Sequence, residues 1–419
     1  MLYEIAIRFF ALAVRVAAFF NPKARAWVDG RRNWRERYRA DFQPVSKVLW
    51  VHAASLGEFE QGRPVIEAFR DRFPGWQVVL SFFSPSGYEI RKNYPHADFV
   101  CYLPADTGRN AADFLDIIRP DAAIFVKYEF WANHLSELKK RGIPVLLVSA
   151  LFRESQPFFR WYGFFWHRML GCFAHFFVQD KASASLLQSI GFQNVTIAGD
   201  TRVDRVLNIA ESAAENHIAS AFAGTGSATG VFIAGSSWEA DEAVFLPVLN
   251  RLKTENGANW KIIVAPHDPS EENVSRICQV AGGGALRYSR ATPASARDAR
   301  VLVIDNVGIL NTLYRYGTVA YIGGGFGKGI HNTLEPAAFG LPVLFGPKYQ
   351  KFEEARQFAA RGGAFPVRDT VDLEVVLEKL RDSGFYAAAA AAVRGYLEES
   401  KGATEQILSF FMQNMGKNP

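Results

Sequence analysis

The stretch Gly323-Gly324-Gly325-Phe326-Gly327-Lys328-Gly329-Ile330-His331-Asn332-Thr333-Leu334-Glu335-Pro336 decides the fold class. It follows an apolar run, Thr318–Ile322, that is typical of a buried strand, and it leads into residues 334–339, which are typical of a helix. A strand, a glycine-rich turn and a helix start leave unpaired backbone N–H groups that suit a phosphate. The glycines permit close approach and positive φ, and Glu335 could accept hydrogen bonds from ribose hydroxyls.

The alternative is a glycine-rich loop that only turns the chain. Three polar residues in it, His331, Asn332 and Glu335, together with the following Gly340–Pro347, favour a nucleotide site. Neither a P-loop lysine pattern nor a three-glycine dinucleotide fingerprint accompanies the stretch.

Composition limits the class of protein. A chain of 419 residues with 49% hydrophobic residues predicts two domains and an appendage. The three cysteines, Cys101, Cys172 and Cys278, are scattered, which indicates neither disulfides nor a zinc site. The net charge of +5 comes from residues 1–45, since the rest of the chain has 38 basic and 38 acidic residues. We therefore expect no nucleic-acid partner, because such a partner requires a basic patch on a folded domain.

Residues 1–45 predict a membrane-associated arm. Residues 2–20 are apolar apart from Glu4, Arg8 and Arg15, which fall on one side of a helix and leave a wide apolar face. Two arginines in mid-span would be costly, so the membrane interface suits this helix better than a spanning position. A helix docked on the domain and a single-pass anchor with snorkelling arginines are the alternatives. The arginines also argue against a signal peptide.

Two further features of the first half could contact lipid. Basic residues follow the apolar helix and would attract anionic headgroups: Lys23, Arg25, Arg31, Arg32, Arg35, Arg37 and Arg39. The aromatic segment Phe158–Arg168 could form an interfacial belt, or it could be buried core.

From Lys47 onward, short apolar runs alternate with amphipathic stretches, as in parallel α/β domains. We predict strands at Val48–His52, Gln77–Ser81, Phe99–Leu103, Ala122–Val126, Val145–Val148 and His175–Val178. The intervening helices are predicted at residues 63–73, 108–119, 131–141 and 181–190. The alternation restarts with strands at Val231–Ala234, Lys261–Ala265, Val301–Ile304, Thr318–Ile322 and Val343–Phe345, and with helices at residues 239–253, 270–281 and 309–316.

This pattern predicts two Rossmann-like, doubly wound domains that face an interdomain cleft. We expect an acceptor-binding domain at residues 46–205 and a nucleotide-binding domain at residues 206–419, with a hinge in the linker 205–230. Helices from Asp372 complete the second domain, and the last of them could cross back to the first.

Glu58 is the candidate base. It lies on the turn after the strand Val48–His52, where a carboxylate could take the proton of an attacking hydroxyl. An ordinary first-turn glutamate favoured by the helix dipole is the alternative.

Five ordered motifs resemble those of the bacterial 3-deoxy-D-manno-octulosonic acid (Kdo) transferases, which are two-domain glycosyltransferases of the GT-B fold. These motifs are His52–Glu58, Arg119–Asp121 with Glu129-Phe130-Trp131, Ala198–Asp204, Asp305–Leu310 with Leu313-Tyr314, and Gly329–Pro336. The resemblance covers nearly the whole chain.

Three positions depart from the family pattern. Arg202 stands where the family has lysine, and Ile309 replaces the glutamate of a Gly-Glu-Leu segment. Pro266-His267-Asp268 stands where the family commonly has Pro-Arg-His, which removes a phosphate-binding arginine.

The resemblance implies an inverting transfer of Kdo from CMP-Kdo to a lipid A precursor. It implies Glu58 as general base, Glu129 as a residue that positions the reacting centre, and Arg202 as the charge that offsets the departing phosphate. Ser55 and Gly57 would lie on the acceptor side. The CMP site would comprise Pro266, His267, Val307, Gly308, Ile309, His331, Asn332, Thr333, Leu334 and Glu335. We expect no metal and no cofactor besides the CMP-Kdo substrate, and a location at the cytoplasmic face of the inner membrane.

Two alternatives stay open: another GT-B enzyme, such as a UDP-sugar transferase or an epimerase of the same fold, and a noncatalytic membrane-bound nucleotide-binding protein. The sequence is silent on the number of Kdo residues added, on the acyl chains and phosphates of the acceptor, and on the oligomeric state.

Overall fold

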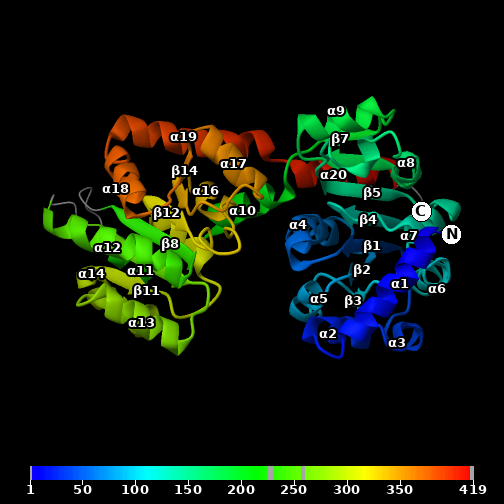
Figure 1. Ribbon diagram of the computed structural model, residues 1–419, viewed down its shortest axis with the longest axis horizontal. Coiled ribbons are helices and arrows are strands. Elements are labelled where there is room, and N and C mark those ends of the chain that lie inside the picture. The colour runs from blue at the N-terminus through cyan, green and yellow to red at the C-terminus, as the bar shows by residue number, and fades with distance from the viewer. Residues whose placement is uncertain (1, 225–229, 256–259, 416–419) are drawn as a thin grey trace. The chain divides into compact units, whose positions relative to one another are not determined.

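The structure is a computed structural model that describes residues 2–224, 230–255 and 260–415 (Figure 1). It divides into two compact units: unit 1 is Met1–Asp204 with Ser400–Pro419, and unit 2 is Arg205–Glu399. The first boundary thus lies one residue before the predicted end of the acceptor domain, and the last helix belongs to unit 1.

Unit 1 contains a sheet of seven parallel strands in the order β3-β2-β1-β4-β5-β6-β7. The strands are β1 (Val48–Ala53), β2 (Gln77–Phe82), β3 (Phe99–Tyr102), β4 (Ala122–Val126), β5 (Val145–Ala150), β6 (His175–Val178) and β7 (Val195–Ile197). Side chains alternate between the two faces of the sheet, so Val48 and Trp50 of β1 enter one apolar core while Leu49 and Val51 enter another. Both faces are therefore buried, as in other parallel sheets.

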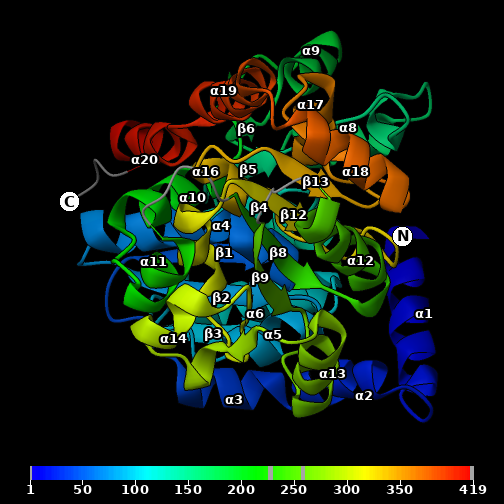
Figure 2. The ribbon, with the colours of Figure 1, turned by 90° about the vertical axis from the view of Figure 1, so that its left-hand side faces the viewer.

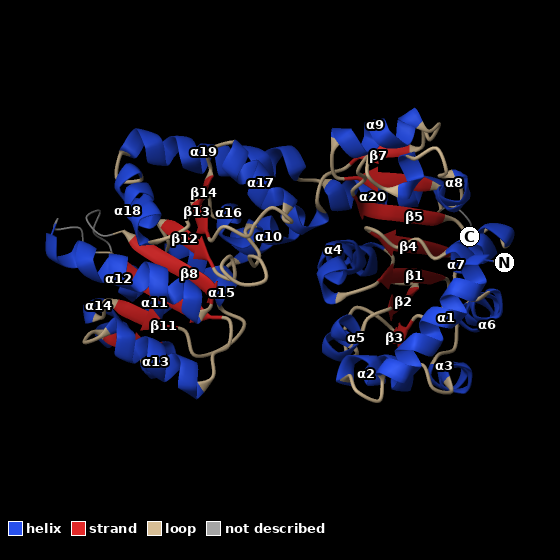
Figure 3. Ribbon diagram, viewed as in Figure 1, coloured by secondary structure: helices blue, strands red, loops and turns tan. Residues whose placement is uncertain are grey.

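Helices cover both faces of this sheet (Figure 3). One core contains side chains of α3 (Trp34–Asp41), α6 (Gly108–Ile118), α7 (Ala132–Lys140), α8 (Phe164–Leu170) and α9 (Lys181–Ser189). The other contains side chains of α4 (Leu56–Arg72), α5 (Pro85–Arg91) and α20 (Ala403–Asn414).

Helix α4 begins at Leu56, seven residues before the predicted start at residue 63. Ser55 and Glu58 form a capping box at its start, and Pro64 lies inside the helix. The stabilisation from capping and from burial of the apolar face thus outweighs the loss of the backbone hydrogen bond that Pro64 cannot donate.

Unit 2 repeats the architecture with a sheet in the order β10-β11-β9-β8-β12-β13-β14, again parallel throughout. Its strands are β8 (Val231–Ser237), β9 (Lys261–Pro266), β10 (Ala285–Arg287), β11 (Val301–Val303), β12 (Val319–Ile322), β13 (Val343–Phe345) and β14 (Ala364–Pro366). Its helices are α11 (His217–Ala223), α12 (Glu239–Glu255), α13 (Glu271–Ala281), α14 (Pro293–Asp298), α15 (Leu310–Leu313), α16 (Leu334–Ala338), α17 (Glu353–Ala360), α18 (Thr370–Lys379) and α19 (Ser383–Ser400), whose last residue lies in unit 1. The predicted fold class of two Rossmann-like α/β domains is confirmed.

The predicted linker 205–230 contains helical structure. Helix α10 (Thr201–Ser212) passes through the boundary between the units, and α11 follows it. Residues 225–229 of the linker lie outside the described residues.

The N-terminal arm is part of unit 1 and contains α1 (Leu2–Ala17), α2 (Pro22–Gly30) and α3; Figure 2 shows α1 leading into α2. Helix α1 has no buried residue, and six of its large apolar side chains are exposed: Leu2, Ile5, Phe9, Phe10, Leu12 and Val16. Among the described residues, no helix is both long and apolar enough to cross a membrane. Helix α3, in contrast, contributes Trp34 and Tyr38 to the core.

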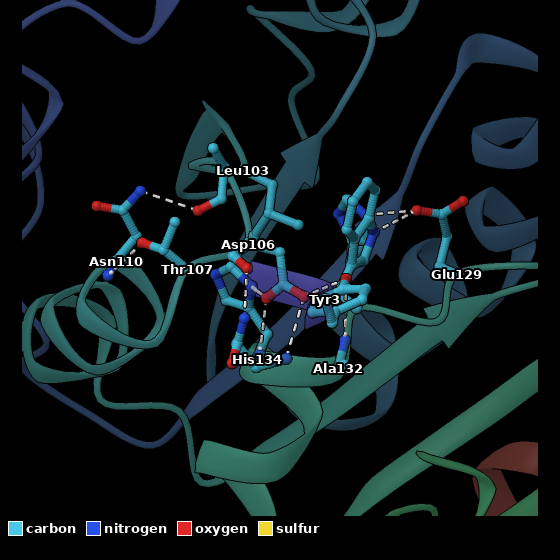
Figure 4. Close-up of polar contacts among 12 residues, drawn as sticks. Tyr3, Leu103, Asp106, Thr107, Asn110, Glu129, Ala132 and His134 are labelled. Atoms are coloured by element: carbon cyan, nitrogen blue, oxygen red, sulfur yellow. Dashed lines mark hydrogen bonds and ion pairs between the residues drawn. The ribbon is translucent and has the colours of Figure 1, made fainter. Parts of the chain in front are cut away.

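Helix α1 is anchored at one point by a buried carboxylate (Figure 4). The Tyr3 hydroxyl donates to Asp106 Oδ2 at 2.6 Å and accepts from the Ala132 N–H at 3.4 Å. Asp106 also bonds His134 Nδ1 at 2.6 Å. Burial first, then the charge of Asp106, raises the pKa of Tyr3, so the phenol stays neutral and donates.

Two of the seven basic residues expected to face headgroups are engaged inside unit 1. Arg31 donates to the carbonyl oxygens of Leu103, Phe83 and Trp27, and burial lowers its pKa to about 9. Arg35 forms an ion pair with Asp113 at 2.6 Å. Arg31 is therefore held inside unit 1 by protein acceptors, whereas headgroup contact by the other six basic residues stays a prediction.

The aromatic segment Phe158–Arg168 is divided between core and surface. Phe158 is buried in the core of unit 1, whereas Trp161 is 95% exposed. Tyr162, Phe164 and Phe165 are exposed as well. The rings of Phe165 and Tyr3 lie 5.7 Å apart, so this aromatic surface adjoins α1.

Candidate active site

Each sheet has one point where its strand order changes direction, between β1 and β4 in unit 1 and between β8 and β12 in unit 2. Ligands of open parallel sheets bind beyond the carboxyl ends of the strands at this switch point. Glu58 follows β1 and Glu129 follows β4, while the glycine-rich stretch follows β12. The candidate residues of each unit thus lie at the edge where the fold places ligands.

Glu58 is the third residue of α4, and its side chain turns back onto the loop that precedes the helix. Its Oε2 accepts hydrogen bonds from the N–H groups of Ala54 at 2.7 Å and Ser55 at 3.2 Å. Burial, followed by the charge of Glu129, raises the pKa of Glu58 to about 7. A carboxyl group with this pKa is poised to accept a proton near neutral pH.

The two acceptor-side residues flank Glu58. Ser55 is the N-cap of α4 and has extended backbone angles. Gly57 is exposed, and a Cβ atom placed on it would contact nothing within 4 Å. Open space beside Gly57 leaves room for a substrate next to the carboxylate.

Glu129 is only 7% exposed and is held by two ring nitrogens (Figure 4). Its Oε2 lies 2.6 Å from Trp131 Nε1 and 2.9 Å from His52 Nε2. It follows Lys127, whose φ of 65° turns the chain sharply after β4. Its position beside Glu58 lets the charge of Glu129 contribute to the raised pKa of Glu58.

Arg202, the predicted counter-charge to phosphate, belongs to unit 1 and lies at the start of α10. Its guanidinium forms an ion pair with Asp200, with Nη2 2.6 Å from Oδ2. Burial opposes ionisation of Asp200, but the charge and hydrogen bonds of Arg202 prevail and lower its pKa. The positive charge of Arg202 is therefore largely balanced within the protein.

In unit 2, a buried carboxylate holds the glycine-rich stretch in place. Asp241 Oδ2 accepts from the N–H groups of Gly324 at 2.8 Å and Trp238 at 3.0 Å, and Oδ1 accepts from the Tyr321 hydroxyl at 3.0 Å. Gly324 has a φ of 93°, and a Cβ atom on Gly323 would lie 2.2 Å from a backbone oxygen. Only glycine fits at these two positions.

Three aromatic rings form a continuous stack beside this loop. Trp238 and His267 lie 4.5 Å apart, and His267 and His331 also lie 4.5 Å apart, with 22° between the ring planes in each pair. Trp238 Nε1 donates to His331 Nε2 at 3.2 Å. Burial, then the proximity of His267, lowers the pKa of His331 to about 4, so this ring is neutral at physiological pH.

A hollow of ≈ 500 Å³ opens beside the stack, and its lining comprises Trp238, Glu239, Ala240, Asp241, Ala243 and Gly327. Of the three stacked rings, Trp238 is the one that lines this hollow.

The remaining predicted donor residues occupy three places in unit 2. Pro266 ends β9, and Val307, Gly308 and Ile309 precede α15, with Gly308 at a φ of 97°. The third place is the start of α16. There Asn332 accepts from the Leu334 N–H at 3.1 Å and donates to Glu335 at 3.1 Å, while Thr333 is buried.

Four residues at these sites had no assigned role from sequence: His52, Trp131, Trp238 and Asp241. All lie in or just after strands that flank a switch point, so their position was available as a signal. Their side-chain contacts depend on which strands pair, and this could not be predicted from the sequence. Among the described residues, no cluster of three or more His, Cys, Asp or Glu could hold a metal ion.

Comparison with known proteins agrees with this geometry. The model of the family described as 3-deoxy-D-manno-octulosonic-acid transferase (kdotransferase) matches residues 32–205. The 3-deoxy-D-manno-octulosonic acid transferase of Bordetella pertussis is 27% identical over 380 residues, covering 87% of each chain. That of Rickettsia prowazekii is 25% identical over 390 residues, covering 90% of this chain and 81% of the relative.

A solved structure extends the likeness of fold. The UDP-GlcNAc 2-epimerase of Neisseria meningitidis bound to UDP-GlcNAc has a TM-score of 0.59 at 16% identity, covering 88% of this chain and all of that one. At this identity the match shows the fold alone.

The two sheets and their switch-point sites define a protein of the GT-B class. The family match lies in unit 1, and the relatives extend the similarity over most of the chain. This chain is therefore related to the bacterial Kdo transferases, which places it among the glycosyltransferases.

Proposed function

We propose that the protein is an inverting glycosyltransferase that moves Kdo from CMP-Kdo to a hydroxyl of a lipid A precursor. The observation that carries the proposal is Glu58: a carboxyl group with a pKa of about 7, at the switch point of the unit that matches the Kdo transferase family. A base of this kind is what a hydroxyl nucleophile requires at neutral pH.

In this proposal each unit has its own task. Glu58 of unit 1 takes the proton as the acceptor hydroxyl attacks the anomeric carbon from the side opposite CMP. Glu129 fixes the charge beside it. The N–H groups of the glycine-rich stretch of unit 2 stabilise the charge on the departing phosphate, since the charge predicted for Arg202 in this role is already paired with Asp200. Unit 2 holds CMP through His267, His331 and the Asn332–Glu335 segment. The reaction proceeds without a metal.

We further propose that the enzyme works at the cytoplasmic face of the inner membrane. The apolar side of α1 and the exposed aromatic side chains at residues 161–165 adjoin one another in unit 1. Between α1, α7 and α8 lies a hollow of ≈ 470 Å³ whose lining includes Lys139 and Arg168. Aromatic and apolar side chains next to such cations suit an anionic lipid surface.

The decisive experiment is transfer by the purified full chain. The protein is incubated with CMP-Kdo and a tetraacylated lipid A precursor, and the product is analysed by mass spectrometry. We expect an added Kdo mass, and no product from the Glu58→Ala variant. Full activity of Glu58→Ala would refute the base, and absence of transfer by the natural protein would refute the function.

Thermal unfolding separates this function from the alternative GT-B activities. We expect CMP to raise the unfolding temperature and UDP to leave it unchanged. Protection by UDP and not by CMP would indicate a different sugar-nucleotide enzyme.

Membrane binding is tested by co-sedimentation with vesicles that contain phosphatidylglycerol. Replacing exposed Phe9 and Phe20 of the arm by serine should weaken binding, because their buried area is lost from the interface. Val371→Ser, at an exposed valine of unit 2, is the matched control and should bind normally. Deletion through residue 40 is unsuitable, because Trp34 and Tyr38 belong to the core. Equal binding by both sets of variants would refute the interface.

A further inference from the structure

His52 is the fifth residue of β1 and is completely buried. Its Nδ1 lies 2.8 Å from the hydroxyl oxygen of Ser81 on β2, and its Nε2 lies 2.9 Å from Oε2 of Glu129 after β4. The imidazole therefore connects three neighbouring strands at the switch point of unit 1. A buried histidine next to a buried carboxylate costs desolvation unless the two groups are paired.

The groups around His52 determine which ring nitrogen bears the proton. The indole N–H of Trp50 can only donate, and it donates to Ser81 Oγ at 2.8 Å. His52 Nδ1 has both Ser81 Oγ at 2.8 Å and the Ser81 carbonyl oxygen at 3.1 Å within reach, so it is satisfied with or without a proton. The carboxylate of Glu129 can only accept, and it is this group that favours a proton on Nε2. The other neutral tautomer would place a lone pair 2.9 Å from a carboxylate oxygen, which is repulsive.

The chain of donors ends on one oxygen atom. Glu129 Oε2 accepts from His52 and, at 2.6 Å, from the Trp131 indole N–H, which can only donate. The same indole nitrogen lies 3.0 Å from His52 Nε2, and its shorter contact is the one with the carboxylate. Trp131 is the N-cap residue of α7, so its backbone position is set by that helix. Two convergent N–H donors inside the protein stabilise the ionised form of Glu129 and fix its rotamer.

We propose that His52 is a positioning residue for catalysis: with Ser81 and Trp50 it holds Glu129 as a fixed negative charge beside Glu58, and so makes Glu58 an effective base at neutral pH. This inference rests on the proposed role of Glu58 as general base.

The electrostatics of Glu58 agree with this role. Burial raises the pKa of Glu58 to about 7, and the charge of Glu129 is the next contribution. The backbone N–H of Ala54 and the charge of Lys127 act in the opposite direction. Burial, with a smaller contribution from the charge of Glu58, raises the pKa of the neighbouring Tyr128, so the phenol stays neutral. Glu129 is thus the charged group whose placement makes Glu58 more basic, and His52 controls that placement.

Three variants test the proposal through the pH dependence of kcat/KM, which reports the ionisation of the free enzyme. The natural protein should show an acidic limb near pH 7. Glu129→Gln removes the charge, and the limb should move about one pH unit lower. His52→Phe keeps an aromatic ring but lacks the donor, so its limb should move in the same direction. His52→Gln can present an N–H to Glu129, and its limb should stay near that of the natural protein.

A purely structural role for His52 predicts a different result. It would lower the unfolding temperature and kcat/KM at all pH values and leave the limb in place. An unshifted limb in His52→Phe, or an equal shift in His52→Gln and His52→Phe, would therefore overturn the proposal. Tryptophan fluorescence reports whether unit 1 of each variant is folded, since seven of the nine tryptophans lie in residues 1–204.

A titration without turnover separates this inference from the proposed function. Carbon-13 NMR of glutamate-labelled protein, with Glu58→Gln to assign the resonance, follows the Glu58 carboxyl group directly. If the natural protein transfers no Kdo, the proposed function fails, but the shift between the two His52 variants still decides the role of His52.

Discussion

Replacing Glu58 by glutamine should stabilise unit 1 in alkaline solution while it abolishes transfer. Glutamine has nearly the same shape, and its side-chain oxygen can still accept from the N–H groups of Ala54 and Ser55. It has no charge to desolvate and no repulsion from Glu129. The variant therefore isolates the energetic cost of keeping an ionised base in this place.

The size of the effect follows from two pKa values for Glu58: 4.5 when unperturbed and about 7 in the folded protein. The folded state binds the Glu58 proton more tightly than the unfolded state does. Protonated Glu58 therefore contributes to folding stability fully below pH 4.5, and this contribution is lost as the pH rises through 7. Between pH 5 and pH 8 the natural protein should lose about 2–3 kcal/mol of stability that Glu58→Gln does not lose.

Urea unfolding at pH 5 and pH 8 measures this difference. Tryptophan fluorescence is a suitable probe, because seven of the nine tryptophans (residues 27, 34, 50, 76, 131, 161 and 166) lie in residues 1–204. The urea midpoint of Glu58→Gln, measured relative to that of the natural protein, should be higher at pH 8 than at pH 5. The transfer activity of the variant should be lower than that of the natural protein by about a factor of 100 or more. An unchanged difference between the two proteins at both pH values would refute the raised proton affinity of Glu58.

Three further predictions concern the packing of unit 1 and the ring stack of unit 2. Gly199→Ala should destabilise unit 1 by about 2 kcal/mol or more, because the added Cβ atom would lie 2.6 Å from the Ser400 carbonyl oxygen. The control in a thermal unfolding assay is Gly191→Ala, since Gly191 has a similar φ of 95° and open space around it. Asp204→Ala removes the acceptor of two N–H groups at the start of α20, which should cost about 1–2 kcal/mol and expose the C-terminal helix to limited proteolysis. His331, whose pKa is lowered to about 4, should show no titration of its ring protons by NMR between pH 5 and pH 8, and a midpoint inside that range would contradict the stacked geometry.

Among the described residues, every central strand was predicted from sequence, and three of the four edge strands were not. β7, β10 and β14 each have three residues, and each lies at an edge of its sheet. An edge strand pairs on one side only, so it needs no continuous apolar run to identify it. Central strands such as β1 are buried on both faces and therefore have that run.

The two carboxylates of the site, Glu58 and Glu129, could be predicted from sequence. The hydrogen bonds that His52 and Trp131 make to Glu129 could not. Glu58 follows a recognisable strand, and the rule for parallel sheets places the residues that follow strands at the ligand edge. His52 contacts Glu129 across 77 residues of sequence, and this contact exists only because β1 pairs with β4. No local pattern encodes that pairing. The aromatic segment near residue 160 was ambiguous for the same reason, since burial of Phe158 and exposure of Trp161 depend on tertiary packing.

The two units show how one topology can support two different halves of a transfer reaction. In unit 1 the switch point carries two carboxylates, and buried N–H donors fix one of them so that it raises the proton affinity of the other. In unit 2 the same point carries glycines at positive φ, a carboxylate that holds their loop, and a stack of three aromatic rings, of which His331 has a lowered pKa. The first arrangement suits removal of a proton, and the second suits a flat base and an anionic phosphate. The two units thus share a backbone fold but differ in side-chain chemistry. An enzyme needs both kinds of site when its nucleophile must lose a proton and its leaving group is an anion.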